Sequence, residues 1–169
     1  MTAEEIIELL GLEPLKPEGG FYRETYRSEE KIPADALPER YAAARVFSTA
    51  IYYLLTPEST STLHRVASDE IFHFYLGDPV CMLQLHPDGR SEVITLGPAI
   101  ERGEKLQVVV PRGSWQGSYL KEGGRFALLG TTVAPGFEFG DYEAGVLESL
   151  IERYPEREDL IRRLGVLQP

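Results

Sequence analysis

The chain has 169 residues, of which 43% are hydrophobic, so it can bury one hydrophobic core without disulfides or metals. Its 27 acidic and 17 basic residues give a formal net charge of -10, which repels polymeric nucleic acid and anionic membrane surfaces. A single nucleotide is not excluded, because it needs only one or two arginines and an aromatic face in a local pocket. We expect one domain over residues 1–169.

The first residues predict a short helix. Thr2 can cap it, Glu5 completes a capping box and Gly11 ends it. This acidic start lacks the basic flank of a secretory signal, and the longest uncharged apolar run, 46–57, is too short to cross a bilayer as a helix. The one cysteine, Cys81, lies in an apolar run and is interpreted as a buried strand residue. We expect a cytoplasmic protein.

A first strand is predicted over residues 21–27, directly after two glycines. Alternation puts Arg23 and Arg27 on one face. It puts three other side chains on the opposite face: Tyr22, Glu24 and Tyr26. An aromatic wall with arginines could hold a phosphate, but an edge strand with its charges outside fits equally well. The face that lines a pocket stays open at this point.

Most of the remaining chain predicts short β-strands. The polar segment 29–40 contains two prolines and is interpreted as a loop. From Val46 onward, apolar and β-branched runs are interrupted by turn signals at intervals of roughly ten residues, which favours a sandwich or barrel. Helical spacing begins near Val146, breaks at Pro155 and resumes over 159–164. The fold class is therefore all-β, a barrel with a short N-terminal helix and a C-terminal helical segment.

The most informative stretches are 64–77 and 110–116. If the strands on either side of 67–69 pair, His64 and Glu70 face the same interior. Strand parity adds further side chains to this face, so we predict one common cavity lined by Thr62, His64, Glu70, Phe72, Ser114 and Gln116. His73 has the opposite parity and is expected on an outer face. His86 precedes a turn and is expected in solvent.

These two stretches resemble the paired motifs of the cupin superfamily. His64, Glu70 and Gly77 match the spacing of the first motif, and Pro111 and Gly113 match the second. Val66 stands where the first motif has its second histidine, and Gln116 stands where the second motif has a histidine.

The wider chain is similar to a branch of that superfamily defined by a domain of unknown function, the DUF985 type. The similar segments are 19–27, 64–70, 110–116 and 133–139. The resemblance implies a jelly-roll barrel, also called a double-stranded β-helix, that forms homodimers and resembles nucleotide-sugar epimerases in fold. It implies no settled activity, because fold similarity does not transfer chemistry.

A metal site is one interpretation of His64, Glu70 and Gln116. One imidazole, one carboxylate and one amide are a poor set for a divalent transition metal, so no cofactor is expected and a metal is the less favoured alternative. The three side chains can instead form a hydrogen-bonding set that recognises a ligand or moves a proton. A third interpretation is a buried pair that only satisfies itself.

The predicted function is binding of a small polar metabolite, with a nucleotide or nucleotide-sugar as the leading ligand. Four residues of the first strand are added to the ligand-binding set: Arg23, Glu24, Tyr26 and Arg27. The alternative is a metal-independent sugar epimerase or isomerase, or a weakly metal-dependent lyase, with His64 and Glu70 as catalytic proton carriers. A protein with a vestigial pocket is a third possibility. A homodimer is also expected, because outward apolar residues such as Ile71 and Tyr75 would otherwise be exposed.

Overall fold

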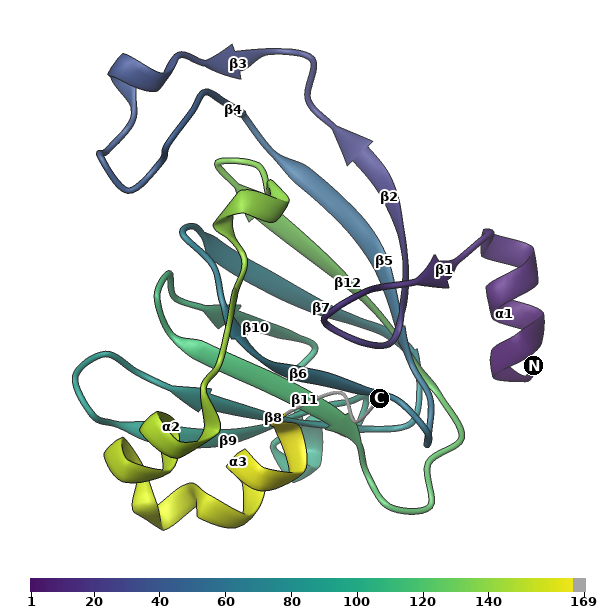
Figure 1. Ribbon diagram of the computed structural model, residues 1–169. Coiled ribbons are helices and arrows are strands. Elements are labelled where there is room, and N and C mark those ends of the chain that lie inside the picture. Colours follow the sequence, from purple (N-terminus) through teal and green to yellow (C-terminus); the bar gives the residue numbers. More distant parts are fainter. Residues whose placement is uncertain (166–169) are drawn as a thin grey trace.

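A computed structural model, which describes residues 1–165, confirms the predicted jelly-roll barrel. Two antiparallel sheets face each other, one with the strand order β1-β2-β5-β12-β7-β10 and one with the order β13-β6-β11-β8-β9 (Figure 1). A separate pair, β3 and β4, extends from one end of the barrel (Figure 1). From β5 to β13 the chain alternates between the two sheets, except that β8 and β9 are neighbours in the smaller one, so the interior-facing side chains come from both sheets.

The strand bounds follow the turn signals of the sequence. The larger sheet contains β1 (Glu13–Pro14), β2 (Phe21–Arg27), β5 (Thr49–Leu55), β7 (Asp69–Gly77), β10 (Gln107–Val110) and β12 (Ala127–Ala134). The smaller sheet contains β6 (Thr60–Arg65), β8 (Val80–Leu85), β9 (Ser91–Leu96), β11 (Trp115–Leu120) and β13 (Glu143–Ala144). The outlying pair is β3 (Lys31–Ile32) and β4 (Arg45–Val46). The predicted loop over 29–40 therefore contains a short strand, followed by a 3-10 turn at Ala34–Ala36.

The N-terminal helix α1 (Ala3–Leu10) forms as its local sequence predicts. The Thr2 side chain accepts a hydrogen bond from the Glu5 N–H, the capping box is complete, and Gly11 ends the helix at a positive φ. Apolar side chains of this segment pack on the outer face of the larger sheet: Ile6 and Leu12 lie in one cluster with Leu54, Phe126 and Leu128. A helix this short is stable only because it docks.

The C-terminal helices α2 (Leu147–Arg153) and α3 (Glu158–Leu164) cover the outer face of the smaller sheet (Figure 1). Their buried side chains, including Tyr154 and Ile161, pack with Leu63 and Leu83. Pro155 lies between the helices, where the sequence predicted the break. Within residues 1–165, the helices are all too short or too polar to cross a bilayer.

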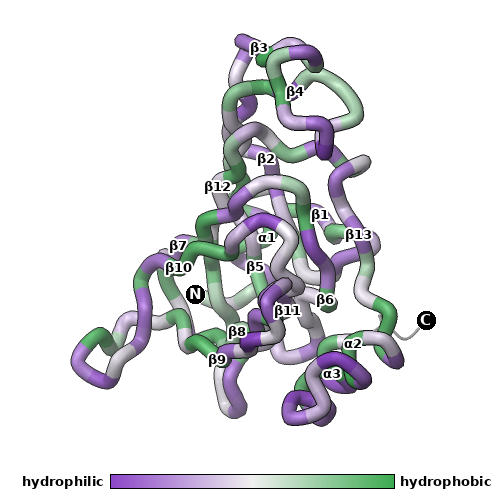
Figure 2. Tube along the Cα trace, turned by 90° about the vertical axis from the view of Figure 1, so that its left-hand side faces the viewer, coloured by the Kyte–Doolittle hydropathy of each residue, from purple (hydrophilic) through white to green (hydrophobic). Residues whose placement is uncertain are grey.

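The barrel interior holds the main hydrophobic core, and hydrophobic stretches of the chain lie along β7, β8 and β10 (Figure 2). Its fully buried members come from both sheets and include Tyr53, Phe72, Met82, Leu96 and Leu129. This core fills only one end of the barrel. The chain between β12 and α2, residues 135–146, crosses the other end and is called the strap below (Figure 1).

Candidate functional site

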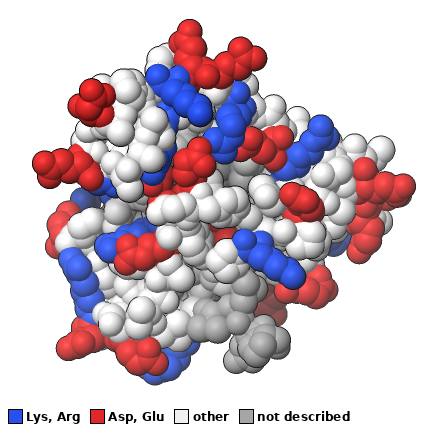
Figure 3. Space-filling view, turned by 45° about the horizontal axis from the view of Figure 1, so that its top comes forward, with Lys and Arg blue, Asp and Glu red and all other residues white. Residues whose placement is uncertain are grey.

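A cavity of about 220 Å³ lies at the end of the barrel that the strap crosses. Its walls come from β2, β5, β6, β7 and β12, the loop before β2, and the strap. Figure 3 shows this end of the molecule, where acidic and basic side chains are intermixed on the surface. The polar groups that face the cavity include two predicted residues, His64 and Glu70.

Gln116 joins His64 and Glu70 across the two sheets. Gln116 pairs directly with His64 in the β11–β6 ladder, while Glu70 lies on β7 of the opposite sheet. The Gln116 amide Nε2 lies 3.1 Å from His64 Nε2 and donates a 2.8 Å hydrogen bond to Glu70 Oε2. All three side chains are buried. The motif position that carries glutamine in place of histidine therefore links the His64 imidazole to the Glu70 carboxyl group.

The hydrogen bonds of His64 fix its neutral tautomer. Its Nδ1 lies 2.7 Å from the Thr62 carbonyl oxygen, which can only accept, so Nδ1 carries the proton. The lone pair of Nε2 then accepts from the Gln116 amide. Nε2 also lies 3.7 Å from Glu18 Oε2, a carboxylate that would stabilise the ring if it became protonated. Both ring nitrogens of His64 therefore have partners inside the protein, and the ring itself forms part of the cavity wall.

Glu70 holds its proton more tightly than an ordinary glutamate. Burial raises its pKa from 4.5 to about 7, and the negative charge of Glu18 adds to the rise. The nearby His64 and hydrogen bonds from Thr131 and Gln116 oppose the shift without cancelling it. The carboxyl group can therefore give or take a proton near neutral pH.

Glu18 is a site residue that the sequence analysis missed. It lies in the loop between β1 and β2, lines the cavity, and accepts a hydrogen bond from Ser61 at 2.9 Å. The loop reaches this position because Gly20 has a φ of +71° and an added Cβ would lie 2.8 Å from the Leu54 carbonyl oxygen. The adjacent Gly19-Gly20 pair was the only local sequence signal for this loop. It indicates that the backbone passes close to another segment, but it does not identify that segment or place Glu18 in the cavity.

A β-bulge changes the predicted faces of β2. The pairing of β2 with β5 shifts register between Glu24 and Tyr26, so one extra residue turns Arg27 to the same face as Glu24. Tyr22, Glu24 and Arg27 line the cavity. Two predicted ligand residues do not: Arg23 donates to the Leu10 carbonyl oxygen beside α1, and Tyr26 is 55% exposed.

Of the six residues predicted to line one common cavity, only His64 and Glu70 do so, and the prediction was wrong for the other four. Gln116 is buried against His64 and Glu70 without lining the cavity itself. Phe72 is buried in the apolar core, at the other end of the interior. Thr62 lies at an irregularity in the β6–β11 pairing and donates to the Glu18 carbonyl oxygen instead of lining the cavity. Ser114 lies 3.1 Å from His86 Nδ1, outside the cavity.

The two other histidines lie away from the cavity. His86 was expected in solvent, but it is buried, because Glu92 binds its Nε2 at 2.8 Å and the Tyr154 hydroxyl donates to its carbonyl oxygen. His73 lies on the outer face of the larger sheet as predicted, beside Thr132 and Gln107.

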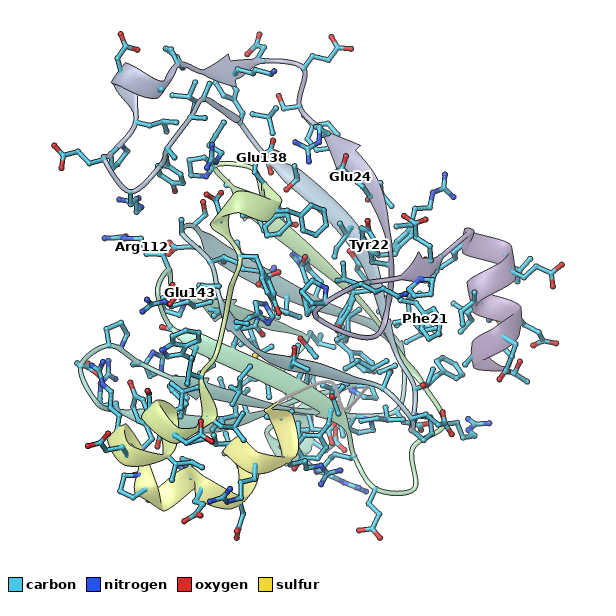
Figure 4. The ribbon with its side chains drawn as sticks, in the orientation of Figure 1. Phe21, Tyr22, Glu24, Arg112, Glu138 and Glu143 are labelled. Carbon is cyan, nitrogen blue, oxygen red and sulfur yellow. The ribbon has the colours of Figure 1, made fainter. Side chains whose placement is uncertain are left out.

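Three arginines from three different strands hold the strap over the barrel. Arg27 of β2 binds Glu138, Arg45 of β4 binds Asp141, and Arg65 of β6 binds Glu143. Only the Arg45–Asp141 pair is buried, with both side chains about 5% exposed. Figure 4 shows Glu24 and Glu138 at the mouth of the barrel. Farther along the strap, Tyr142 stacks on the His64 ring, with 5.1 Å between ring centroids.

The residues present do not form a good transition-metal site. Within residues 1–165, no group of three or more His, Cys, Asp or Glu side chains is placed to hold an ion. The Gln116 amide nitrogen points at both His64 and Glu70, and an amide N–H donor cannot ligate a metal. The donor set thus fits hydrogen bonding to an organic ligand better than metal ligation.

The fold and site together define a barrel of the cupin class with a polar internal pocket. The family model "Cupin superfamily (DUF985)" matches residues 4–145, and the chain belongs to this family. It is 32% identical over 133 residues to the "Uncharacterized protein YML079W" of Saccharomyces cerevisiae, covering 74% of this chain and 66% of the yeast protein. The chain therefore spans about two thirds of the length of that relative.

Solved structures with the same fold include close and distant proteins. A "Hypothetical protein from Leishmania major" is 36% identical, with a TM-score of 0.86 over 99% of this chain and 100% of that one. Oxalate decarboxylase OxdC of Bacillus subtilis is 16% identical, with a TM-score of 0.53 over 90% of this chain and 37% of that one. One study of the Bacillus enzyme concerns its Mn(II) centres. At this identity the similarity shows the fold alone.

Proposed function

We propose that the cavity binds a small polar metabolite through hydrogen bonds to Glu70 and Glu18 and through contact with the His64 ring, with Gln116 holding His64 and Glu70 in place. The observation that carries the proposal is the buried polar group itself. Burying an imidazole, an amide and a carboxylate costs stability compared with apolar side chains of similar size, and the barrel has an apolar core elsewhere. Ligand binding would explain why the barrel keeps these buried polar groups, which the fold does not need for its stability.

The size of the cavity limits how much of a ligand it can enclose. Pockets for drug-sized ligands have volumes of about 300–1,000 Å³, and this cavity is smaller, at about 220 Å³. One ring of a sugar or a base is therefore the portion that fits inside. For a nucleotide or nucleotide-sugar, our leading ligand, the remainder would lie outside the cavity.

The charges that face the cavity favour an uncharged, hydroxyl-bearing ring. Four carboxyl groups line it, those of Glu18, Glu24, Glu70 and Glu138. Arg27 offsets two of them, since it binds both Glu24 and Glu138. An anionic group inside would face the remaining carboxylates, whereas hydroxyl groups could donate to them.

The proposal is tested by calorimetric titration with nucleosides, nucleotides, nucleotide-sugars and free hexoses. His64→Ala should weaken the best binder by about 10-fold or more, since it removes a ring that lines the cavity and the partner that holds the Gln116 amide in place. His73→Ala is the matched control, because this histidine lies on the outer face of the same barrel. Equal affinity in the wild type and both variants, or no binding by any compound, would overturn the proposal.

A proton-transfer enzyme is the second candidate, favoured by the Glu70 pKa of about 7. His64 and Glu70 both contact the same Gln116 nitrogen, so they lie on one side of a bound ring. This arrangement suits an isomerase that moves a proton along one face better than an epimerase, which needs acid and base on opposite faces. Deuterium uptake from solvent into a bound sugar, measured by NMR, would identify such an activity, and Glu70→Gln should abolish it.

We further propose that the protein functions in the cytoplasm as a homodimer. The support is its single cysteine, buried and unpaired at Cys81, and the exposed side chains Tyr75 and Val109 on the outer face of the larger sheet. Subcellular fractionation tests the first point. Light scattering tests the second.

A further inference from the structure

A second depression, about 570 Å³ in volume, adjoins the cavity on the other side of Tyr142 and Val66, which line both. Its cationic residues are Arg40, Arg65 and Arg112, and we call it the arginine groove. Figure 4 shows Arg112 and Glu143 on this side of the barrel. The groove has no role in the site described above.

The carboxylates of the arginine groove are already neutralised. Asp141 accepts two hydrogen bonds from the buried Arg45, and Glu143 accepts two from Arg65. Among the ion pairs of residues 1–165, none includes Arg40 or Arg112. The groove thus has two uncompensated guanidinium groups on a molecule whose formal net charge is -10.

Both arginines are attached to rigid parts of the structure. Arg40 donates from Nε to the Ala67 carbonyl oxygen, and its guanidinium lies 4.8 Å from the centre of the Tyr41 ring. These contacts leave its two terminal nitrogens free to donate.

Arg112 lies in a tight turn whose backbone is held on both sides. The Ser114 N–H donates to the Pro111 carbonyl oxygen, and the next residue, Gly113, has a φ of +74° and donates to the Val66 carbonyl oxygen. Asp69 is the nearest carboxylate partner, and it accepts from the Arg112 backbone N–H without pairing with the guanidinium. The backbone of this turn is therefore held in place, and Arg112 lines the groove from it.

We propose that the arginine groove binds the phosphate group of a metabolite whose polar ring occupies the cavity. This inference rests on the proposed function and specifies its ligand as a phosphorylated one. Guanidinium groups donate in pairs to phosphate oxygens, and two that lack carboxylate partners are suited to a phosphomonoester or a diphosphate. The cavity cannot serve the same purpose, because carboxylates line it.

The adjacency of the two hollows also fits this division. The cavity encloses about one ring, and the arginine groove lies on the other side of the shared residues Val66 and Tyr142. A phosphate attached to the ring, directly or through a sugar, would therefore have to extend past these two residues to reach the groove.

The test compares matched pairs of ligands by calorimetric titration: a nucleoside with its diphosphate, and a hexose with its 1-phosphate. In the wild type, the phosphorylated member of at least one pair should bind about 10-fold tighter or more. In the double variant Arg40→Gln/Arg112→Gln this advantage should disappear, while the unphosphorylated member keeps its affinity. The matched control is Arg102→Gln, whose side chain is 81% exposed in the loop between β9 and β10.

Further arms separate the possible failures. An advantage that persists in the double variant, or no advantage in the wild type, overturns the arginine groove as a phosphate site. Pyrophosphate alone, bound by the wild type and not by the double variant, with no ring compound bound, supports the anion site and overturns the proposed cavity ligand. If a hexuronate binds as tightly as the hexose phosphate, the groove recognises a carboxylate equally well, and the assignment of phosphate as its ligand group is overturned.

Discussion

The two ends of the barrel interior are built from the same strands but bury different side chains. Along β7, the inward residues run from Glu70 through Phe72 to Phe74, and along β11 they run from Gln116 to Leu120. The apolar end forms the core, and the polar end forms the cavity. One end therefore supplies stability, while the other gives up stability for polar groups that can bind a ligand.

The largest expected effect is at the apolar end. Phe72→Ala should lower the free energy of unfolding by about 3–5 kcal/mol, because Phe72 is 1% exposed and its removal leaves a void in the core. Phe139→Ala is the matched control, since this strap residue is 57% exposed and should cost about 0.5 kcal/mol or less. Urea denaturation measures both. Equal losses would mean that the core does not carry the stability assigned to it.

At the polar end, Glu70→Gln should change the pH dependence of stability. In the wild type the folded carboxyl has a pKa of about 7 and the unfolded carboxyl one near 4.5, so stability falls as the pH rises between these values. The full loss, reached above the folded pKa, corresponds to about 3 kcal/mol. Below the unfolded pKa both states are protonated and the loss is absent.

Glu70→Gln lacks this titration, so its stability relative to the wild type should increase from about pH 4 to about pH 8. Urea denaturation across this range is the measurement. Glu122→Gln, in an exposed turn, is the control and should follow the wild type. A Glu70→Gln curve parallel to the wild-type curve would contradict a raised pKa at this site.

The outer face of the larger sheet differs from both ends of the interior, because it exposes apolar side chains through which two copies of the chain could associate. Tyr75 and Val109 are each about 50% exposed there, so a second copy of the chain could bury them. We expect light scattering to give twice the chain mass at micromolar concentration, and Tyr75→Lys/Val109→Lys to give a monomer with nearly unchanged thermal unfolding. Val93→Lys, on β9 of the other sheet, is the control. A monomeric wild type would rule out this interface.

The smallest expected effect is on metal content. Protein purified without added ions should contain less than one equivalent of any transition metal, because the Gln116 amide occupies the space between His64 and Glu70 with N–H donors. His64→Ala should therefore leave the metal content unchanged. Stoichiometric metal by elemental analysis, lost in His64→Ala, would favour a metal-dependent enzyme.

Local sequence signals predicted most of the elements. The capping box of Thr2 and Glu5 acts within one helical turn, and the break at Pro155 acts through one missing N–H. Both can therefore be predicted without knowing which distant segment packs against them. These two signals depend on neighbours that are close in sequence. His64 and Glu70 do face the same interior, but the predicted reason was wrong: β6 and β7 do not pair with each other and lie in opposite sheets, whose inner faces both line the barrel.

The errors arose where a distant segment sets the conformation. The bulge between Glu24 and Tyr26 is a property of the pairing with β5, and the extra residue reversed the predicted faces of Arg27 and Tyr26. Likewise, the neighbouring Glu92 and the distant Tyr154 of the C-terminal segment bury His86, which its own turn had placed in solvent. Strand parity cannot predict the bulge, since the alternation of side chains holds only while the strand pairing is regular. The residues next to His86 in the sequence likewise do not show that Tyr154 will pack against it.

The sequence by itself determined the class of fold and pointed to His64 and Glu70, because alternation, turn chemistry and motif spacing are short-range properties. The tertiary structure alone decided that Glu18 enters the cavity, that the strap crosses it, and that Arg40 and Arg112 line one groove beside it. Those residues come from loops separated by long stretches of chain, and no local pattern links them. Their positions depend on how the two sheets and the strap pack together, and the closed barrel brings them to one end.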